Sequence, residues 1–367
     1  MDQDRVSQLA LHFIPGIGNV LVKQLISYCG SAEGVFAAPK SKLLKIPGIG
    51  EASANAILTQ KPLHKAEGEL EKAEKEGVRI LFHSDKEYPY RLKQIHDAPT
   101  LLYFRGNTSL NTGKVVAVVG TRKATAYGRS VTDKIVEGLA PHNPLIVSGL
   151  AYGIDIHAHK TALKYQLPTL AVMAGGINKI YPAAHKNTAR DMQVSGGIIT
   201  EQVFDTVPEP PKFPARNRII AGLADAIIII EAAKRGGALI TAEMANDYNR
   251  DVFAIPGEIN RKYSEGCNDL IKKHKAHLLT DIADLEYIMN WDSDDHKDQK
   301  TPLNLDALNE EEKRVMEELE KCHQAAQIDK LSWSTQIPVN KLASVLLTLE
   351  FQGLVKSLPG KNYEKVK

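Results

Sequence analysis

Residues 115–128 read VVAVVGTRKATAYG, in which five apolar residues are followed by a glycine, a threonine and two cations. An apolar run without alternating polar residues is typical of a strand buried on both faces of a sheet. A glycine at the end of such a strand lets the next helix begin close to a phosphate, and Arg122 can bind two phosphate oxygens at once. The glycines do not follow the G-x-G-x-x-G spacing, so the dinucleotide-binding fingerprint is absent.

Five more short apolar runs follow, at residues 145–147, 169–173, 197–200, 226–230 and 252–255. Segments with helical spacing of apolar residues separate them, for example residues 128–140, 155–165 and 238–248. Buried strands that alternate with helices predict an α/β fold with a doubly wound, mostly parallel sheet. Ligands of such sheets bind beyond the carboxyl ends of the strands.

The loops after these strands contain small residues and cations. They supply a candidate set for binding a polyanion: Gly120, Thr121, Arg122, Ser148, Gly149, Lys186, Arg216, Asn217 and Arg218. Residues 114–218 hold 13 Lys or Arg and 7 Asp or Glu, although the whole chain is nearly balanced at 46 against 44. Several anion sites along one edge of a sheet suit the phosphates of a nucleic acid strand better than a single pyrophosphate.

Two of these cations and four nearby rings have alternative roles. Arg216 or Arg218 could be a buried ion-pair partner, and the candidate carboxylates are those of Asp225 and Glu231. The rings near the loops could stack on bases or could pack against the sheet. These rings are Tyr127, Tyr152, Tyr181 and Phe213.

The first hundred residues have a helical pattern with one internal repeat. The sequence IPGIG occurs at residues 14–18 and again at residues 46–50, each time between two apolar-periodic segments. Glycine allows the positive φ of a tight turn, and the helix that follows offers free N–H groups to a phosphate. The pattern predicts paired helix-hairpin-helix turns, which either bind a DNA backbone or only pack as a helical bundle.

The end of the chain predicts a linker and a small domain. Residues 291–301 are polar and highly charged, and three helical segments follow at residues 310–322, 328–333 and 338–351. Residues 354–355 and 363–366 could form a hairpin, which completes the order of a winged helix-turn-helix. Asn340 and Lys341 could then face duplex DNA, or the domain could dock a protein.

Other classes of site are not indicated. Cys29, Cys267 and Cys322 have no spacing typical of a disulfide framework or a zinc site. His157 and His159 are two residues apart on a helix, so they face different directions and do not form a metal pair. The longest apolar run, residues 226–230, is too short to span a bilayer, and no signal peptide is visible. We therefore expect a cytoplasmic protein with no membrane insertion, no metal and no cofactor.

Five motifs together resemble the DNA-processing protein A (DprA, or Smf) family. They lie at residues 118–128, 148–163, 175–187, 213–232 and 236–257. The first reads VVGTRKATAYG and the second SGLAYGIDIHAHKTAL. The resemblance implies a Rossmann-like domain between a helix-hairpin-helix (SAM-like) domain and a winged helix. It also implies a homodimer that binds and protects single-stranded DNA and loads the RecA recombinase in natural transformation.

The resemblance also implies roles for individual residues. Arg122 matches the arginine of the family's Gly-Ser/Thr-Arg turn, and Lys186 matches the lysine after its Tyr-Pro loop. Both would contact the DNA backbone, and residues 216–218 match an Arg-Asn-Arg run. The chain departs from the family pattern at Asn178, at His185 and at residues 235–238.

The expected domains follow from these patterns. They are a helix-hairpin-helix domain at 1–65, a connecting segment at 66–113, a single-stranded DNA-binding Rossmann-like domain at 114–290, an acidic linker at 291–302 and a winged helix at 303–367. Two other functions remain open. One is a nucleotide phosphoribohydrolase, for which Glu243 after Gly236 and Gly237 is the candidate catalytic residue, although Leu239 and Ile240 replace the usual glycine and threonine. The other is a duplex-binding regulator that uses the winged helix.

Overall fold

The computed structural model describes residues 2–291, 308–321, 326–351, 354–358 and 362–365. The chain forms two compact units, Met1–Ser293 and Asp294–Lys367. The first unit contains a helical bundle and a large sheet domain, and the second contains a small three-stranded sheet with three helices.

The N-terminal bundle contains two structural copies of one hairpin. Its helices are α1 (Gln3–Leu11), α2 (Asn19–Cys29), α3 (Ala32–Ala37), α4 (Lys40–Leu43), α5 (Glu51–Gln60) and α6 (Leu63–Lys75). Gly16 and Gly48 have φ values of +80° and +82°, and Gly18 and Gly50 cap α2 and α5. The isoleucines on either side of the left-handed glycines are buried to the same extent in both copies. The repeat therefore encodes a tandem helix-hairpin-helix, as predicted.

The main sheet has nine strands in the order β1-β2-β6-β5-β4-β3-β7-β8-β9. They are β1 (Arg79–Phe82), β2 (Leu101–Gly106), β3 (Val115–Val119), β4 (Leu145–Ser148), β5 (Thr169–Val172), β6 (Gly197–Thr200), β7 (Ala226–Ile229), β8 (Asp251–Ala254) and β9 (His277–Leu278). All pairs from β6 to β9 are parallel, and β1 and β2 are antiparallel to their neighbours. The chain reverses its direction of travel across the sheet between β3 and β7. This is the topological switch point at which such sheets bind ligands.

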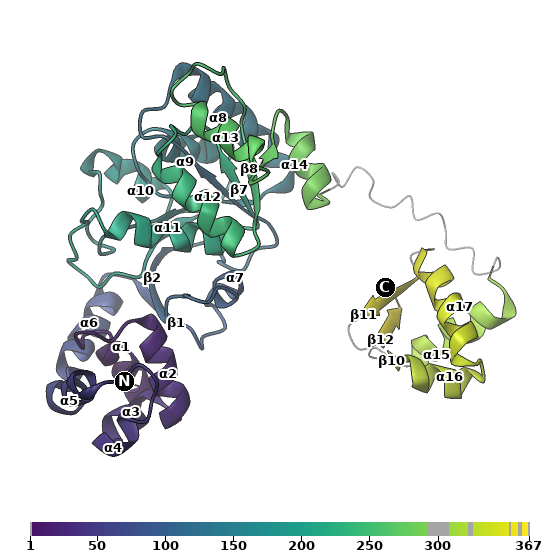
Figure 1. Cartoon of the computed structure of the whole chain (residues 1–367), viewed down its shortest axis with the longest axis horizontal. Helices are drawn as coiled ribbons and strands as arrows, with labels where there is room; N and C mark the ends of the chain where they lie inside the picture. The colour runs from purple at the N-terminus through teal and green to yellow at the C-terminus, as the bar shows by residue number, and fades with distance from the viewer. Residues whose placement is uncertain (1, 292–307, 322–325, 352–353, 359–361, 366–367) are drawn as a thin grey trace. The chain divides into compact units, whose positions relative to one another are not determined.

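Helices cover both faces of this sheet, which explains its continuous apolar strands (Figure 1). Val116 and Val118 pack with α8 (Ala126–Gly138), α9 (Ile154–Lys164) and α14 (Ile282–Met289). The alternate residues of β3 pack on the other side, with α11 (Lys212–Leu223), α12 (Gly237–Asp247) and α13 (Glu265–Lys272). The prediction of a doubly wound, mostly parallel sheet is therefore confirmed.

Residues 66–113 do more than connect. They include most of α6, the helix α7 (Tyr90–Lys93), and the strands β1 and β2, which extend the sheet at one edge. The first four residues of β2 are fully buried. The repeating pattern of strand, small-residue loop and helix begins at residue 114, and β1 and β2 precede it, so the sheet starts earlier than this pattern predicts.

The second unit has the expected winged-helix order. It comprises α15 (Glu310–Lys321), β10 (Ala326–Gln327), α16 (Ile328–Thr335), α17 (Val339–Phe351), β11 (Val355–Leu358) and β12 (Asn362–Lys365). Strands β11 and β12 pair antiparallel as the predicted hairpin. Most of the expected linker, residues 292–302, and also Cys322 lie outside the described residues. Trp291 is buried and packs in the core of the first unit.

Candidate nucleic-acid interface

The carboxyl ends of β3 and β7 border a cavity of about 610 Å³, which we call the switch-point cavity. Gly120, Thr121 and Arg122 line it after β3, and Arg216 and Asn217 line it from α11. A Cβ on Gly120 would lie 2.6 Å from Ile154 Cγ1, so only glycine lets α9 begin this close to the strand end. The sheet thus brings five of the nine candidate residues to one hollow at its switch point.

Arg122 has a fixed position and an unneutralised charge. Its guanidinium lies over the ring of Phe213, 5.0 Å from the ring centre, and the Phe213 ring lies 5.9 Å from that of Tyr181. Both rings line the switch-point cavity. Among the described residues, no carboxylate lies within ion-pairing distance of Arg122. The cation is therefore available to an anion.

A second hollow, which we call the basic groove, lies between the loops after β3 and β4. It has a volume of about 540 Å³, and Arg122 borders it as well as the switch-point cavity. Its other cations are Lys123, Arg129 and Lys160, and Tyr152 forms part of its wall. Arg122 therefore joins two adjacent hollows along the carboxyl edge, which is the arrangement that a chain of phosphates requires.

Lys186 begins α10 (Lys186–Asp191) and is exposed. The preceding residue, His185, is buried, and its Nδ1 lies 2.8 Å from the carbonyl oxygen of Leu150. The His185 ring also meets Tyr152 edge to face, with 4.9 Å between ring centres. His185 thus holds the Tyr-Pro loop against the loop after β4. This contact places Lys186 on the same edge of the sheet as Arg122.

Arg216 is buried beneath the loops. Its Nη1 donates to the carbonyl oxygens of Gly149, at 2.6 Å, and Val172. Burial lowers the pKa of Arg216 to about 10, and the same burial raises the pKa of neighbouring Asp155. A Cβ on Gly149 would lie 2.6 Å from both Arg216 Nη1 and Asp155 Oδ2. Ser148 is also buried and donates its hydroxyl to the carbonyl oxygen of Val118 at 2.6 Å. These side chains support the loops from below.

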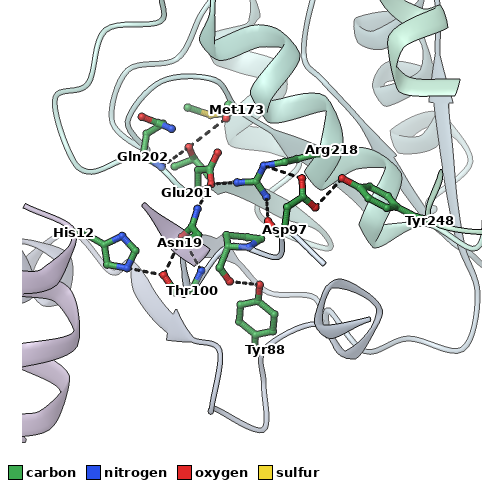
Figure 2. Close-up of polar contacts among 12 residues, drawn as sticks. His12, Asn19, Tyr88, Asp97, Thr100, Met173, Glu201, Gln202, Arg218 and Tyr248 are labelled. Atoms are coloured by element: carbon green, nitrogen blue, oxygen red, sulfur yellow. Dashed lines mark hydrogen bonds and ion pairs between the residues drawn. The ribbon is translucent and has the colours of Figure 1, made fainter. Parts of the chain in front are cut away.

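Arg218 belongs to a different cluster, which joins the sheet to the N-terminal bundle (Figure 2). Its guanidinium pairs with Glu201 and donates to the carbonyl oxygen of Asp97 at 2.8 Å. The Glu201 carboxylate also accepts from the amide of Asn19 at 3.4 Å, and Asn19 Oδ1 accepts from Thr100 N and Oγ1 at 3.0 and 2.9 Å. Asn19 is the first residue of α2, directly after the first IPGIG turn.

The carboxylates named as candidate partners for these arginines have other contacts, so that prediction was wrong. Asp225 pairs with Arg91 at 2.7 Å, and Glu231 accepts hydrogen bonds from Thr125. The partner of Arg218 is Glu201, which directly follows β6. No local pattern predicts this pairing, because it depends on the antiparallel packing of β2 against β6, which brings Asp97 and Thr100 alongside Glu201.

The glutamate that was the candidate catalytic residue of a phosphoribohydrolase does not lie at the switch-point cavity. Glu243 is exposed, and its Oε1 lies 3.8 Å from Lys275 Nζ. It is not among the residues that line the switch-point cavity. Within the described part of the chain, no group of three His, Cys, Asp or Glu side chains is placed to hold a metal ion. None of its helices is both long and apolar enough to cross a membrane.

The order of the three parts defines the class. A tandem helix-hairpin-helix, a Rossmann-like sheet domain with basic loops at its carboxyl edge, and a winged helix follow one another, and each part matches a family model of DNA-processing proteins or of the helix-hairpin-helix class. The family model for DNA recombination-mediator protein A matches residues 79–290, with a SAM-like helix-hairpin-helix tandem at 9–60 and a DprA winged helix domain at 299–361. The chain belongs to the DNA processing protein A family, also called Smf.

Known relatives agree with this assignment. The protein Smf of Synechocystis sp. is 31% identical over 97% of this chain and 98% of its own length. The crystal structure of DprA from Streptococcus pneumoniae superposes with a TM-score of 0.67 at 33% identity, covering 78% of this chain and 97% of that one. A structure of the Helicobacter pylori protein, described for its single-stranded DNA binding mode, covers 59% of this chain and 97% of its own with a TM-score of 0.53 at 30% identity.

Proposed function

We propose that this protein binds single-stranded DNA along the carboxyl edge of its main sheet and does no chemistry on it. The observation that carries the proposal is the position of Arg122, whose unpaired guanidinium borders both the switch-point cavity and the basic groove. Phosphates would bind Arg122, Lys186 and the groove lysines, and bases would lie against exposed rings such as Tyr152 and Tyr181. The DNA-binding mode described for the H. pylori relative supports this choice of ligand.

Within the proposal, the candidate residues divide into two groups. We propose that one group, Gly120, Thr121, Arg122, Lys186 and Asn217, contacts the strand directly. Ser148, Gly149 and Arg216 act indirectly, through the loops after β4 and β5: the donors of Ser148 and Arg216 are bound to buried carbonyl oxygens, and Gly149 leaves room for Arg216 and Asp155. Arg218 also acts indirectly, through the N-terminal bundle, because its guanidinium is paired with Glu201. The resemblance to the family further supports delivery of the strand to the RecA recombinase, a homodimeric state and a cytoplasmic location.

The test is the double variant Arg122→Ala/Lys186→Ala, with Lys134→Ala as the matched control. Lys134 lies on α8 and is exposed, but it pairs with Asp281 and borders neither hollow. Fluorescence anisotropy with a labelled single strand at several salt concentrations should show weaker binding by the double variant. The plot of log affinity against log salt concentration has a negative slope, and its magnitude should decrease by about 0.7 for each phosphate contact that is lost. Unchanged affinity and slope in the double variant would overturn the proposed interface.

Recombinase delivery and dimerisation have their own measurements. Sedimentation should show a dimer, and the wild type should accelerate recombinase filament growth on single strands already coated by a single-strand binding protein. The double variant should dimerise but fail to accelerate growth. A monomer, or acceleration by the double variant, would contradict these parts of the proposal.

The winged helix does not favour a second function in duplex recognition. Lys341 of the expected recognition helix pairs with Glu311 at 2.5 Å, so its charge is neutralised within the domain. The other exposed side chains near the start of α17 include Val339 and Asn340, which carry no charge. A duplex-binding helix needs cations for the phosphate backbone.

A further inference from the structure

A third hollow lies beside the two that form the proposed strand interface. It has a volume of about 800 Å³ and lies between the start of α8, the end of β7 and the loop at residues 257–264 after β8. Tyr127 and Tyr263 both line it, so we call it the tyrosine cavity. Since β7 lies between β3 and β8 in the sheet, this cavity continues the row of hollows along the carboxyl edge.

The inner wall of the tyrosine cavity contains a buried carboxylate. Glu231 is 4% exposed and accepts hydrogen bonds from Thr125 Oγ1 at 2.6 Å and Thr125 N at 3.0 Å. No cation pairs with it among the described residues. An ionised carboxylate can accept about four hydrogen bonds, and a buried charge is stable only when it is well satisfied. Glu231 therefore offers acceptor capacity to a ligand that brings N–H donors into the cavity.

The outer part of the cavity is aromatic and basic. Tyr127 is half exposed, and its hydroxyl donates to the carbonyl oxygen of Pro256 at 2.7 Å, which fixes the ring at the rim. Arg261 and Lys262 are exposed on the opposite loop, and Arg261 pairs with Glu258 at 2.9 Å at the surface. Glu258 also lines the cavity, so the charge of Arg261 is already neutralised, whereas no carboxylate pairs with Lys262 among the described residues. A planar ligand with a phosphate would find a ring and the cation of Lys262 here.

The loop that carries these residues is held in place, so the cavity is preformed. The side-chain amide of Asn268 donates to the carbonyl oxygen of Gly257 at 2.9 Å and accepts from its N–H at 3.1 Å. The N–H of Ala232 donates to the carbonyl oxygen of Tyr263 at 2.7 Å. Two clamps thus tie the loop to α13 and to the end of β7, and a preformed pocket binds without the cost of ordering a loop.

We propose that the tyrosine cavity is a further nucleotide subsite for the same bound strand, and that it selects bases that carry an amino group. The exocyclic amine of cytosine, adenine or guanine would donate to Glu231, and the adjoining phosphate would meet Lys262. Thymine has no exocyclic amine, and its single N3–H donor lies between two carbonyl oxygens that a carboxylate repels. This inference rests on the proposed function, because the strand must first lie along the carboxyl edge.

The test compares strands of dT alone with strands in which some dT is replaced by dC or dA. Wild type should bind the mixed strands about tenfold more tightly, which is the size of one base-specific contact. Glu231→Gln should lose this preference and keep its affinity for dT. Glu137→Gln, at an exposed position near the end of α8 and outside the lining of the tyrosine cavity, should behave as wild type. An equal preference in wild type and Glu231→Gln would overturn the subsite.

A second variant covers the case in which Glu231→Gln weakens the fold. Arg261→Ala/Lys262→Ala changes only exposed side chains, and it should lower the salt slope for dC-containing strands but leave the slope for dT unchanged. Free dCMP provides the remaining comparison: tight binding of dCMP to Arg122→Ala would show a free-nucleotide site and overturn the assignment to a bound strand. The proposed function has a separate test: it would be contradicted by unchanged strand affinity in Arg122→Ala/Lys186→Ala, whatever the base preference of the wild type.

Discussion

Replacing Arg218 with alanine would leave the carboxylate of Glu201 without its cation in the interior of the first unit. The two side chains are 11% and 13% exposed, so water cannot replace the lost guanidinium. Removing one partner of a buried ion pair costs about 3–5 kcal/mol of unfolding free energy. We expect Arg218→Ala to fall in this range. Arg218→Met/Glu201→Gln should recover most of the loss, because it removes the buried carboxylate together with its cation, and Asp97, the second partner of Arg218 at 4.0 Å, is 31% exposed.

The assay uses the fluorescence of one tryptophan. The chain contains two, and Trp333 of the second unit is 79% exposed whereas Trp291 is buried in the first. In a Trp333→Phe background, urea unfolding followed by fluorescence therefore reports on the first unit alone. The control is Arg79→Ala, which breaks an exposed pair with Glu87 at 2.8 Å and should cost less than about 1 kcal/mol.

Strand binding separates a structural role from a direct one. If Arg218 only anchors the N-terminal bundle, folded Arg218→Ala should bind single-stranded DNA with the salt slope of the wild type. A cost below about 1 kcal/mol together with a slope reduced by about 0.7 would refute the reasoning, because it would make Arg218 a phosphate ligand.

Three other variants test the remaining parts of the structure. Arg216→Lys should weaken strand binding without changing the salt slope, since Arg216 holds loops and does not meet phosphate; titration at several salt concentrations checks this. Gly120→Ala should cost about 1–3 kcal/mol in urea unfolding, because its Cβ would lie 2.6 Å from Ile154 Cγ1. Burial lowers the pKa of His12 to about 4 and that of His159 to about 3, so the unfolded chain binds more protons than the folded one below pH 6.5. The free energy of unfolding is therefore highest above pH 6.5 and decreases as the pH falls from 6.5 towards these values. His12→Gln/His159→Gln should flatten the pH dependence of unfolding between pH 6 and 4 by about 1.4 kcal/mol per pH unit for each histidine.

The sheet could be predicted from the sequence because its strands are buried on both faces. Uninterrupted runs such as residues 115–119 and 226–230 have no polar face, and only a sheet covered by helices on both sides accommodates them. Arg122 could be assigned to the carboxyl edge of the sheet for a related reason, since the carboxyl ends of parallel strands meet at one edge. The strands β1 and β2 were missed because their loops carry no comparable glycine and cation pattern.

The roles of Arg216 and Arg218 could not be predicted in the same way. Arg216 and Arg218 lie on either side of Asn217 in the same helical turn of α11. The neighbouring residues in the sequence do not show whether either guanidinium contacts solvent or buried protein groups. Arg216 is buried because carbonyl groups after β4 and within β5 converge on it, and Arg218 because Glu201 lies opposite. The tyrosine cavity likewise depends on a loop and a helix that are about 130 residues apart in the sequence.

The shared core between the N-terminal bundle and the sheet has a practical consequence for shortened forms of this protein. Leu101, Tyr103 and Ile198 pack in the same cluster as the isoleucines of the two hairpins. A truncated chain that starts at β1 would therefore expose these apolar side chains, and the Glu201–Arg218 pair would lose the hydrogen bond from Asn19. Such a fragment should aggregate. Its failure to bind single-stranded DNA would therefore not show which part of the intact protein binds the strand.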